Sequence, residues 1–92
     1  MTASLDRSVH LGKDVVFREL DGEAVILNLE TGTYFGLDTV GTRIWQFCQD
    51  HGSLTSVWQA MQREFDAPAD VLRADLLAFV DELSSRGLVT LQ

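Results

Sequence analysis

Hydrophobic and polar residues alternate through the first half of the chain, and this two-residue period is typical of β-strands. Asp21-Gly22 interrupts the pattern with a strong hairpin signal, because both central positions of a two-residue turn need positive φ. Thr31-Gly32 interrupts it again, with glycine at a left-handed position. The pattern therefore predicts a three-stranded antiparallel meander, with strands over residues 15–20, 23–29 and 33–37.

The Asp-Gly turn also fixes the register of the first two predicted strands. It places Phe17 opposite Ile26 and Val16 opposite Leu27. We expect the more apolar face of the sheet to cover the core, and this face carries Val16, Val25, Leu27, Phe35 and Leu37. The opposite face carries Phe17, Ile26 and Tyr34, so it also requires partial cover.

From residue 38 onward the hydrophobic period changes to that of amphipathic helices. Asp38 or Thr39 is the expected cap of the first helix, and Gly52 closes it. Ser53 caps the second helix. The apolar stripes of the two helices are Val40, Ile44, Phe47 and Cys48 in the first, and Leu54, Val57, Met61 and Phe65 in the second.

A third helix is predicted after Asp66 and Pro68, which stand in the order expected for a cap and an early proline. Arg86 and Gly87 end it with a basic last turn and a left-handed C-cap. A short apolar tail follows over residues 88–91. Three strands followed by three helices indicate an α+β fold, a winged helix-turn-helix in which the sheet is the wing.

The size and charge of the chain limit its domain count and its ligands. Its 92 residues are 46% hydrophobic, which suits one domain with one small core. We expect this domain to span residues 15–92, after an N-terminal arm of residues 1–14 that is partly flexible. The net charge of -7 disfavours binding to nucleic acid phosphates. The helix order still leaves a winged-helix DNA-binding regulator open as an alternative.

The sequence offers no obvious catalytic or metal-binding constellation. Cys48 is the only cysteine, so no internal disulfide can form, and this agrees with a reducing compartment. Cys48 and His51 lie three residues apart, but a metal site normally needs three or four ligands. No apolar run reaches the length of a membrane span, and no signal peptide precedes the domain. We therefore expect a cytoplasmic, non-catalytic protein without cofactor, metal or membrane contact.

The strand over residues 33–37 is the last of its sheet, and a last strand is usually an edge strand. Its unpaired backbone groups suit the capture of an extended peptide by strand addition. Tyr34 faces away from the predicted core and is the better candidate for side-chain contact. On the third helix, Val71, Ala74 and Ala78 lie together away from the main apolar stripe, and small side chains let a peptide backbone come close. The alternative interpretation is an ordinary sheet edge beside a solvated helix face.

The run from Asn28 to Trp45 reads Asn-Leu-x-Thr-Gly-x-Tyr-Phe-x-Leu-Asp-x-x-Gly-x-x-Ile-Trp and resembles the family of PQQ synthesis protein D (PqqD). The third helix adds a pattern similar to that family's C-terminal half, with Val71, Asp75, Phe79, Leu83 and Gly87 at four-residue spacing. The resemblance covers about residues 15 to 91. The Tyr34-Phe35 and Ile44-Trp45 pairs differ from PqqD itself and are closer to the leader-binding proteins of lasso-peptide clusters.

The resemblance implies a module that binds the leader of a ribosomally synthesised precursor peptide. The leader would add as a strand beside residues 33–37 and lie against the helix over residues 68–86. The module would present it to a separate leader peptidase, cyclase or radical enzyme. A PQQ-type peptide chaperone for a radical enzyme is the alternative within the family. The residues expected to contact the peptide are Tyr34, Phe35, Gly36, Leu37, Val71, Ala74, Asp75 and Ala78.

Overall fold

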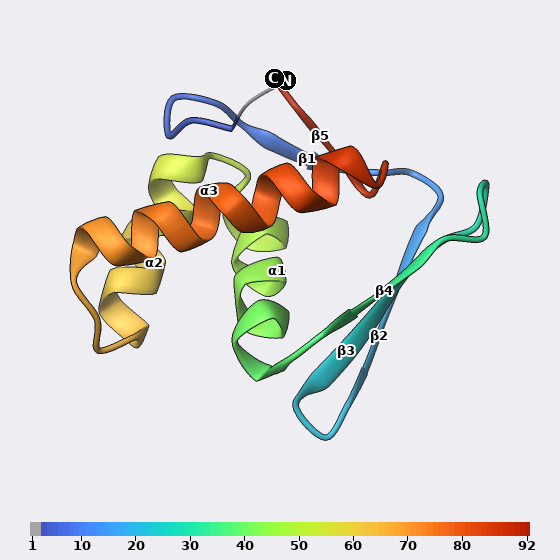
Figure 1. Ribbon diagram of the computed structural model, residues 1–92, viewed down its shortest axis with the longest axis horizontal. Helices are drawn as coiled ribbons and strands as arrows, with labels where there is room; N and C mark the ends of the chain where they lie inside the picture. The colour runs from blue at the N-terminus through green and yellow to red at the C-terminus, as the bar shows by residue number, and fades with distance from the viewer. Residues whose placement is uncertain (1–2) are drawn as a thin grey trace.

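The computed structural model describes residues 3–92 and confirms the predicted α+β fold (Figure 1). A three-stranded antiparallel sheet has the order β2-β3-β4, and a two-stranded sheet pairs β1 with β5. The elements are β1 (Val9–Leu11), β2 (Val15–Leu20), β3 (Glu23–Asn28), β4 (Tyr34–Leu37), α1 (Thr39–His51), α2 (Leu54–Glu64), α3 (Ala69–Ser85) and β5 (Val89–Leu91). The three-stranded sheet extends like a wing from the helices, which lie around the core (Figure 1).

The hairpin between β2 and β3 has the geometry that its sequence predicts. Asp21 has a φ of 57° and Gly22 a φ of 81°, as a two-residue turn requires. Phe17 pairs with Ile26 and Val16 with Leu27, which confirms the predicted register. The turn thus fixes which side chains share a face, although it does not decide which of the two faces is buried.

The prediction of the buried sheet face was wrong for β2 and β3 and right for β4. The core side carries Phe17, Ile26 and Phe35, because β4 pairs Phe35 with Ile26. Ile26 is completely buried, whereas Val25 on the other face is 44% exposed. The outer face therefore carries Val16, Val25 and Leu27, which were predicted to be buried, together with Tyr34. Phe35 and Leu37 lie on the core side as predicted, and Tyr34 faces away from the core as predicted.

Asn28 explains this choice of face. Its side chain is buried on the core side, where Nδ2 donates to the Gly87 carbonyl at 3.2 Å. Its Oδ1 accepts from the Glu30 N–H at 2.9 Å and so orders the turn before β4. Phe17 adds a stacked contact with Trp45 of α1, with ring centroids 6.2 Å apart. A buried polar residue carries no hydrophobic signal, so the alternation of apolar residues pointed to the wrong side.

Asp38 and Ser53 stand at the helix starts where the sequence predicts them, although the Ser53 side chain forms no capping hydrogen bond. The Asp38 carboxylate accepts from the Gly41 N–H at 2.7 Å and starts α1, and Gly52 with a φ of 73° ends it. Gly87 ends α3 in the left-handed conformation, and the Leu88 N–H donates to the Leu83 carbonyl at 3.0 Å. The expected cap at Asp66 was wrong, because α3 begins after Pro68 and no side chain caps it.

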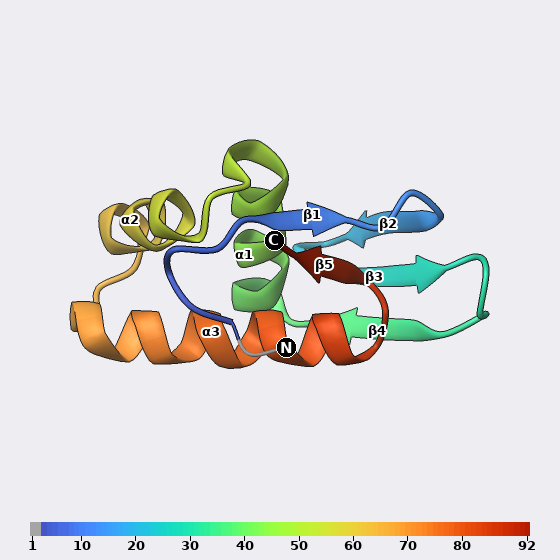
Figure 2. The ribbon, with the colours of Figure 1, turned by 90° about the horizontal axis from the view of Figure 1, so that it is seen from above.

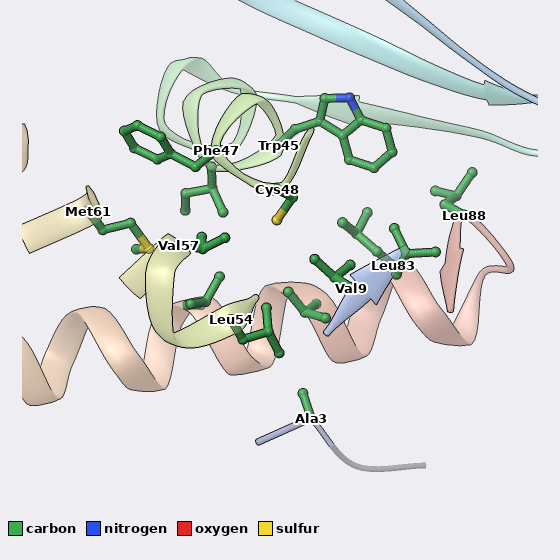
Figure 3. Close-up of a cluster of buried hydrophobic side chains, with 14 of the residues drawn as sticks. Ala3, Val9, Trp45, Phe47, Cys48, Leu54, Val57, Met61, Leu83 and Leu88 are labelled. Carbon is green, nitrogen blue, oxygen red and sulfur yellow. The ribbon is translucent and has the colours of Figure 1, made fainter. Parts of the chain in front are cut away.

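The core lies between the helices and the two sheets (Figure 3). Trp45 and Cys48 of α1 face into it with Leu54 and Met61 of α2, and each of the four is at most 3% exposed. The segment over residues 88–91 supplies β5, which packs beside α3. Its buried Leu88, Val89 and Leu91 complete the core at the end of the chain.

The pairing of β1 with β5 ties the two ends of the described chain together. Val9 of β1 pairs with Leu91 and is only 3% exposed, although no strand was predicted there. The domain boundary expected at residue 15 stays a prediction, but Val9–Leu11 packs as part of the fold. Among residues 3–92, none of the helices is sufficiently long and apolar to cross a bilayer.

Candidate peptide-binding site

The free edge of β4 is the centre of the candidate site. β4 pairs with β3 on one side and with no strand on the other within residues 3–92. Figure 2 shows β4 as the strand of the meander nearest to α3, with its open edge toward the helix. The predicted edge strand is therefore present, and its free edge is open on the side of the sheet nearest to α3.

The pairing pattern shows which backbone groups of β4 point to this edge. The Asn28 N–H donates to the Thr33 carbonyl at 2.8 Å, so these two residues form a hydrogen-bonded pair. Such pairs alternate along an antiparallel ladder, so the backbone groups of Phe35 and Leu37 point toward β3. The N–H and C=O groups of Tyr34 and Gly36 consequently point to the free edge, where a further strand can pair with them.

A groove of about 460 Å³ opens between β4, the start of α1 and α3. Its lining consists of Phe35, Gly36, Leu37, Asp38, Val40, Gly41, Ile44, Asp75 and Phe79. Most of these side chains are apolar, and the only charged ones are the two aspartates. The groove thus combines an open strand edge with an apolar wall, which is the arrangement that strand addition uses.

The end of the groove near the start of β4 is linked to α3 by a cation–π contact. The Arg86 guanidinium lies 4.9 Å from the centre of the Phe35 ring. Arg86 also forms an ion pair with Glu82 one turn earlier, at 3.0 Å. These contacts hold Phe35 half-buried between the sheet and the C-terminal turns of α3.

Four of the predicted contact residues line the groove, namely Phe35, Gly36, Leu37 and Asp75. Tyr34 is 70% exposed on the outer face of the sheet, beside the edge. Val71, Ala74 and Ala78 are exposed on α3 but lie outside the groove lining. Contact between a ligand and any of these eight residues stays a prediction.

The sequence analysis missed the apolar wall that the helices contribute to the groove. The sequence placed Val40 and Ile44 on the core stripe of the first helix. It placed Phe79 on the core stripe of the third helix, with Leu72, Leu76, Val80 and Leu83. Ile44 is indeed 3% exposed, but Val40 is 50% exposed in the first turn of α1. An exposed valine directly after an edge strand was the available signal, since a purely structural stripe would be covered along its whole length.

Cys48 lies apart from this groove and is chemically protected. It is 3% exposed on the core side of α1, and burial raises the pKa of its thiol to about 12. The thiolate is the reactive form of cysteine, so this side chain is inert near neutral pH. The expectation of a core cysteine is confirmed.

Comparisons with known proteins place this geometry in context. The solved structure of TbiB1 in complex with the TbiA(beta) leader peptide is 34% identical in sequence, with a TM-score of 0.82 over 87% of this chain and 93% of that one. The structure of lasso peptide synthetase B1 complexed with the leader peptide is 23% identical, with a TM-score of 0.80 over 90% of this chain and 98% of that one. At that identity the second likeness establishes the shared fold.

No curated protein matches the sequence. The family model described as coenzyme PQQ synthesis protein D (PqqD) matches residues 23–89, which include β3, β4, all three helices and the whole groove lining. Since this match spans more than half of the 92 residues, the chain belongs to the PqqD family.

Proposed function

We propose that this protein binds the leader of a ribosomally synthesised precursor peptide and presents it to a separate processing enzyme. The leader adds as a strand beside β4 and places its side chains in the groove against α1 and α3. Membership of the PqqD family and the 34% identity with a leader-bound structure support this role. Of the pathways open to the family, the Tyr34-Phe35 and Ile44-Trp45 pairs and the fold shared with lasso peptide synthetase B1 favour a lasso-peptide-type pathway over PQQ synthesis.

The observation that carries the proposal is the open edge of β4 beside the groove. Tyr34 and Gly36 together offer two N–H and two C=O groups to an incoming strand. Backbone pairing supplies affinity for almost any extended peptide, and the side-chain wall then selects among sequences. The wall available to the leader comprises Phe35, Leu37 and Asp75 together with the α1 residues of the groove. Val71, Ala74 and Ala78 extend this surface along α3 as predicted contacts.

The chemistry of the groove supports recognition rather than catalysis. Its lining contains no serine, cysteine, histidine or lysine, so no nucleophile or ordinary general base other than the two aspartates faces a bound peptide. Cys48 is buried elsewhere with its thiol protonated. We therefore propose that the protein leaves its ligand chemically unchanged and acts in the reducing cytoplasm, where its lone thiol stays reduced.

The benefit to the partner enzyme is a higher local concentration of substrate. A leader held on this module delivers the attached core peptide to the enzyme as one chain, so binding energy from the leader acts on a distant reaction. This predicts a lower apparent KM for the full-length precursor and little change for a leaderless core peptide.

The experiment uses the cognate precursor peptide and its processing enzyme. Turnover of full-length and leaderless precursor is measured with and without the protein. Mass spectrometry follows precursor incubated with the protein alone. The proposal expects stimulation of the full-length substrate only and no mass change without the enzyme. Equal stimulation of both substrates would identify a general enzyme activator instead, and cleavage by the protein alone would identify an enzyme.

A further inference from the structure

The charged side chains that line the groove are both acidic, and this affects which leaders the groove accepts. Asp38 and Asp75 line it from two sides, since Asp38 ends the β4 wall and Asp75 stands on α3. Both carboxylates are exposed. Across residues 3–92, Asp75 forms no hydrogen bond or ion pair, and Asp38 has only its helix-capping bond to Gly41. Two carboxylates thus face the same opening.

The start of α1 partly compensates the Asp38 carboxylate through the Gly41 N–H, whereas no cationic side chain of the described residues pairs with Asp38 or Asp75. Within the described chain, no arginine, lysine or histidine lines the groove. The neighbours of Asp75 one turn away on α3 are Val71, Leu72, Ala78 and Phe79, which carry no charge. Arg73 lies about 160° around the helix from Asp75, on the far side. Arg86 is held by Glu82 at 3.0 Å, so its charge is already paired.

An apolar position lies next to the acidic one at a spacing that a strand can match. Phe79 follows Asp75 by one helical turn, which is about 5.4 to 6 Å along the axis. Two residues of an extended strand cover about 6.6 to 6.8 Å, and their side chains point to the same face. A strand lying along β4 can therefore place one side chain between Asp38 and Asp75 and the next one on that face against Phe79 and Ile44.

We infer that the groove selects leaders in which a lysine or arginine and a large apolar residue are separated by a single residue. The basic side chain pairs with Asp75 and Asp38, and the apolar one covers Phe79, Ile44 and Phe35. The net charge of -7 adds a long-range attraction for such a cationic segment. This inference rests on the proposed function and specifies the class of peptide that the site takes.

The order of the basic and the apolar residue along the leader also depends on the direction in which the leader runs beside β4. Phe35 lies beside Arg86 near the end of α3, whereas Leu37 and Asp38 lie toward Asp75. A leader running antiparallel to β4 therefore presents its basic residue before the apolar one. A parallel leader presents them in the reverse order.

The test is selection from a random 12-residue peptide library displayed on its encoding RNA, with the wild-type protein immobilised. We expect enriched peptides to carry lysine or arginine two positions from a large apolar residue. Selection on Asp75→Lys should replace the basic residue with aspartate or glutamate and leave the apolar preference intact. Asp70→Lys is the matched control, because it makes the same change of charge at an exposed aspartate of α3 that lies outside the groove.

One enriched peptide is then compared with its lysine-to-glutamate counterpart by fluorescence polarisation. We expect an affinity loss of tenfold or more in low salt and a smaller loss in 300 mM salt, because these carboxylates are solvent-exposed. Thermal melts confirm that Asp75→Lys is folded. Enriched apolar peptides without a basic preference, or a basic preference that survives Asp75→Lys, would overturn the charge inference alone. If the selection enriches no peptide beyond the level reached with an unrelated immobilised protein, the proposed function is overturned as well.

Discussion

Replacing Gly36 by proline tests the backbone pairing of β4, because it removes the N–H donor that this residue offers at the free edge. The Gly36 N–H points to the free edge, so proline removes a donor that the leader needs and none that β3 needs. Gly36 has no positive φ, and no neighbouring atom lies within 4 Å of a Cβ built there. The ring therefore enters open space at the edge.

The expected magnitude follows from the lost bond and from the carbonyl that it leaves behind. One hydrogen bond contributes about 0.5 to 1.5 kcal/mol net, and a desolvated carbonyl without a donor costs about 1 to 3 kcal/mol. We expect the leader's binding free energy to weaken by about 1 to 3 kcal/mol, which raises the Kd roughly 5- to 150-fold. The shift of φ from a strand value toward that of proline should cost about 1 to 2 kcal/mol of stability, which leaves the domain folded.

The matched control is Gly36→Ala, which keeps the N–H and places its methyl group in open space. Fluorescence polarisation with the cognate leader measures the Kd of both variants, and urea unfolding measures their stability. We expect Gly36→Ala to bind within about twofold of the wild type, as for a substitution worth less than ~0.5 kcal/mol. A folded Gly36→Pro variant that binds as tightly as Gly36→Ala would show that the leader does not pair with β4 at this position.

Three further predictions address stability and the faces of the helices. Leu76→Ala should cost about 2 to 5 kcal/mol in urea unfolding because Leu76 is completely buried. Ala78→Trp should change the free energy of unfolding by less than about 1 kcal/mol because Ala78 is exposed. It should weaken leader binding about tenfold, since Ala78 lies only about 60° around α3 from Asp75. A loss of stability as large as that of Leu76→Ala would show that the buried and exposed faces of α3 are assigned wrongly. Burial holds the pKa of Cys48 near 12 against an ordinary 9.0, so the unfolded chain releases this proton first. Stability should therefore fall above about pH 9, by up to about 1.4 kcal/mol per pH unit, and Cys48→Ala should lack that part of the slope.

The local signals in the sequence predicted most of the fold because each acts over a few residues. Asp21-Gly22 defined a turn and its register, and Asp38 and Gly87 marked helix ends. The position of β4 at the sheet edge followed from chain order alone. The part of the site that the β4 backbone supplies was therefore predictable from the sequence before any tertiary contact was known.

Features that depend on contacts between distant segments were not predictable in the same way. The buried face of the meander was decided by Asn28 bonding to Gly87 and by Phe17 stacking on Trp45, which are far apart in the chain. Strands β1 and β5 contain three residues each, too few for a periodic pattern, and they gain stability by pairing with each other. The wall of Val40, Ile44 and Phe79 arises only where α1 and α3 meet β4.

Amide-resolved hydrogen exchange by NMR tests the central claim most directly, because strand addition predicts an alternating response along β4. The Phe35 and Leu37 amides point toward β3 and should already be protected in the free protein. The Tyr34 and Gly36 amides point to the free edge and should exchange rapidly until leader is added, then become protected at saturation. Unchanged exchange at Tyr34 and Gly36 in the presence of saturating leader would contradict binding by strand addition at this edge.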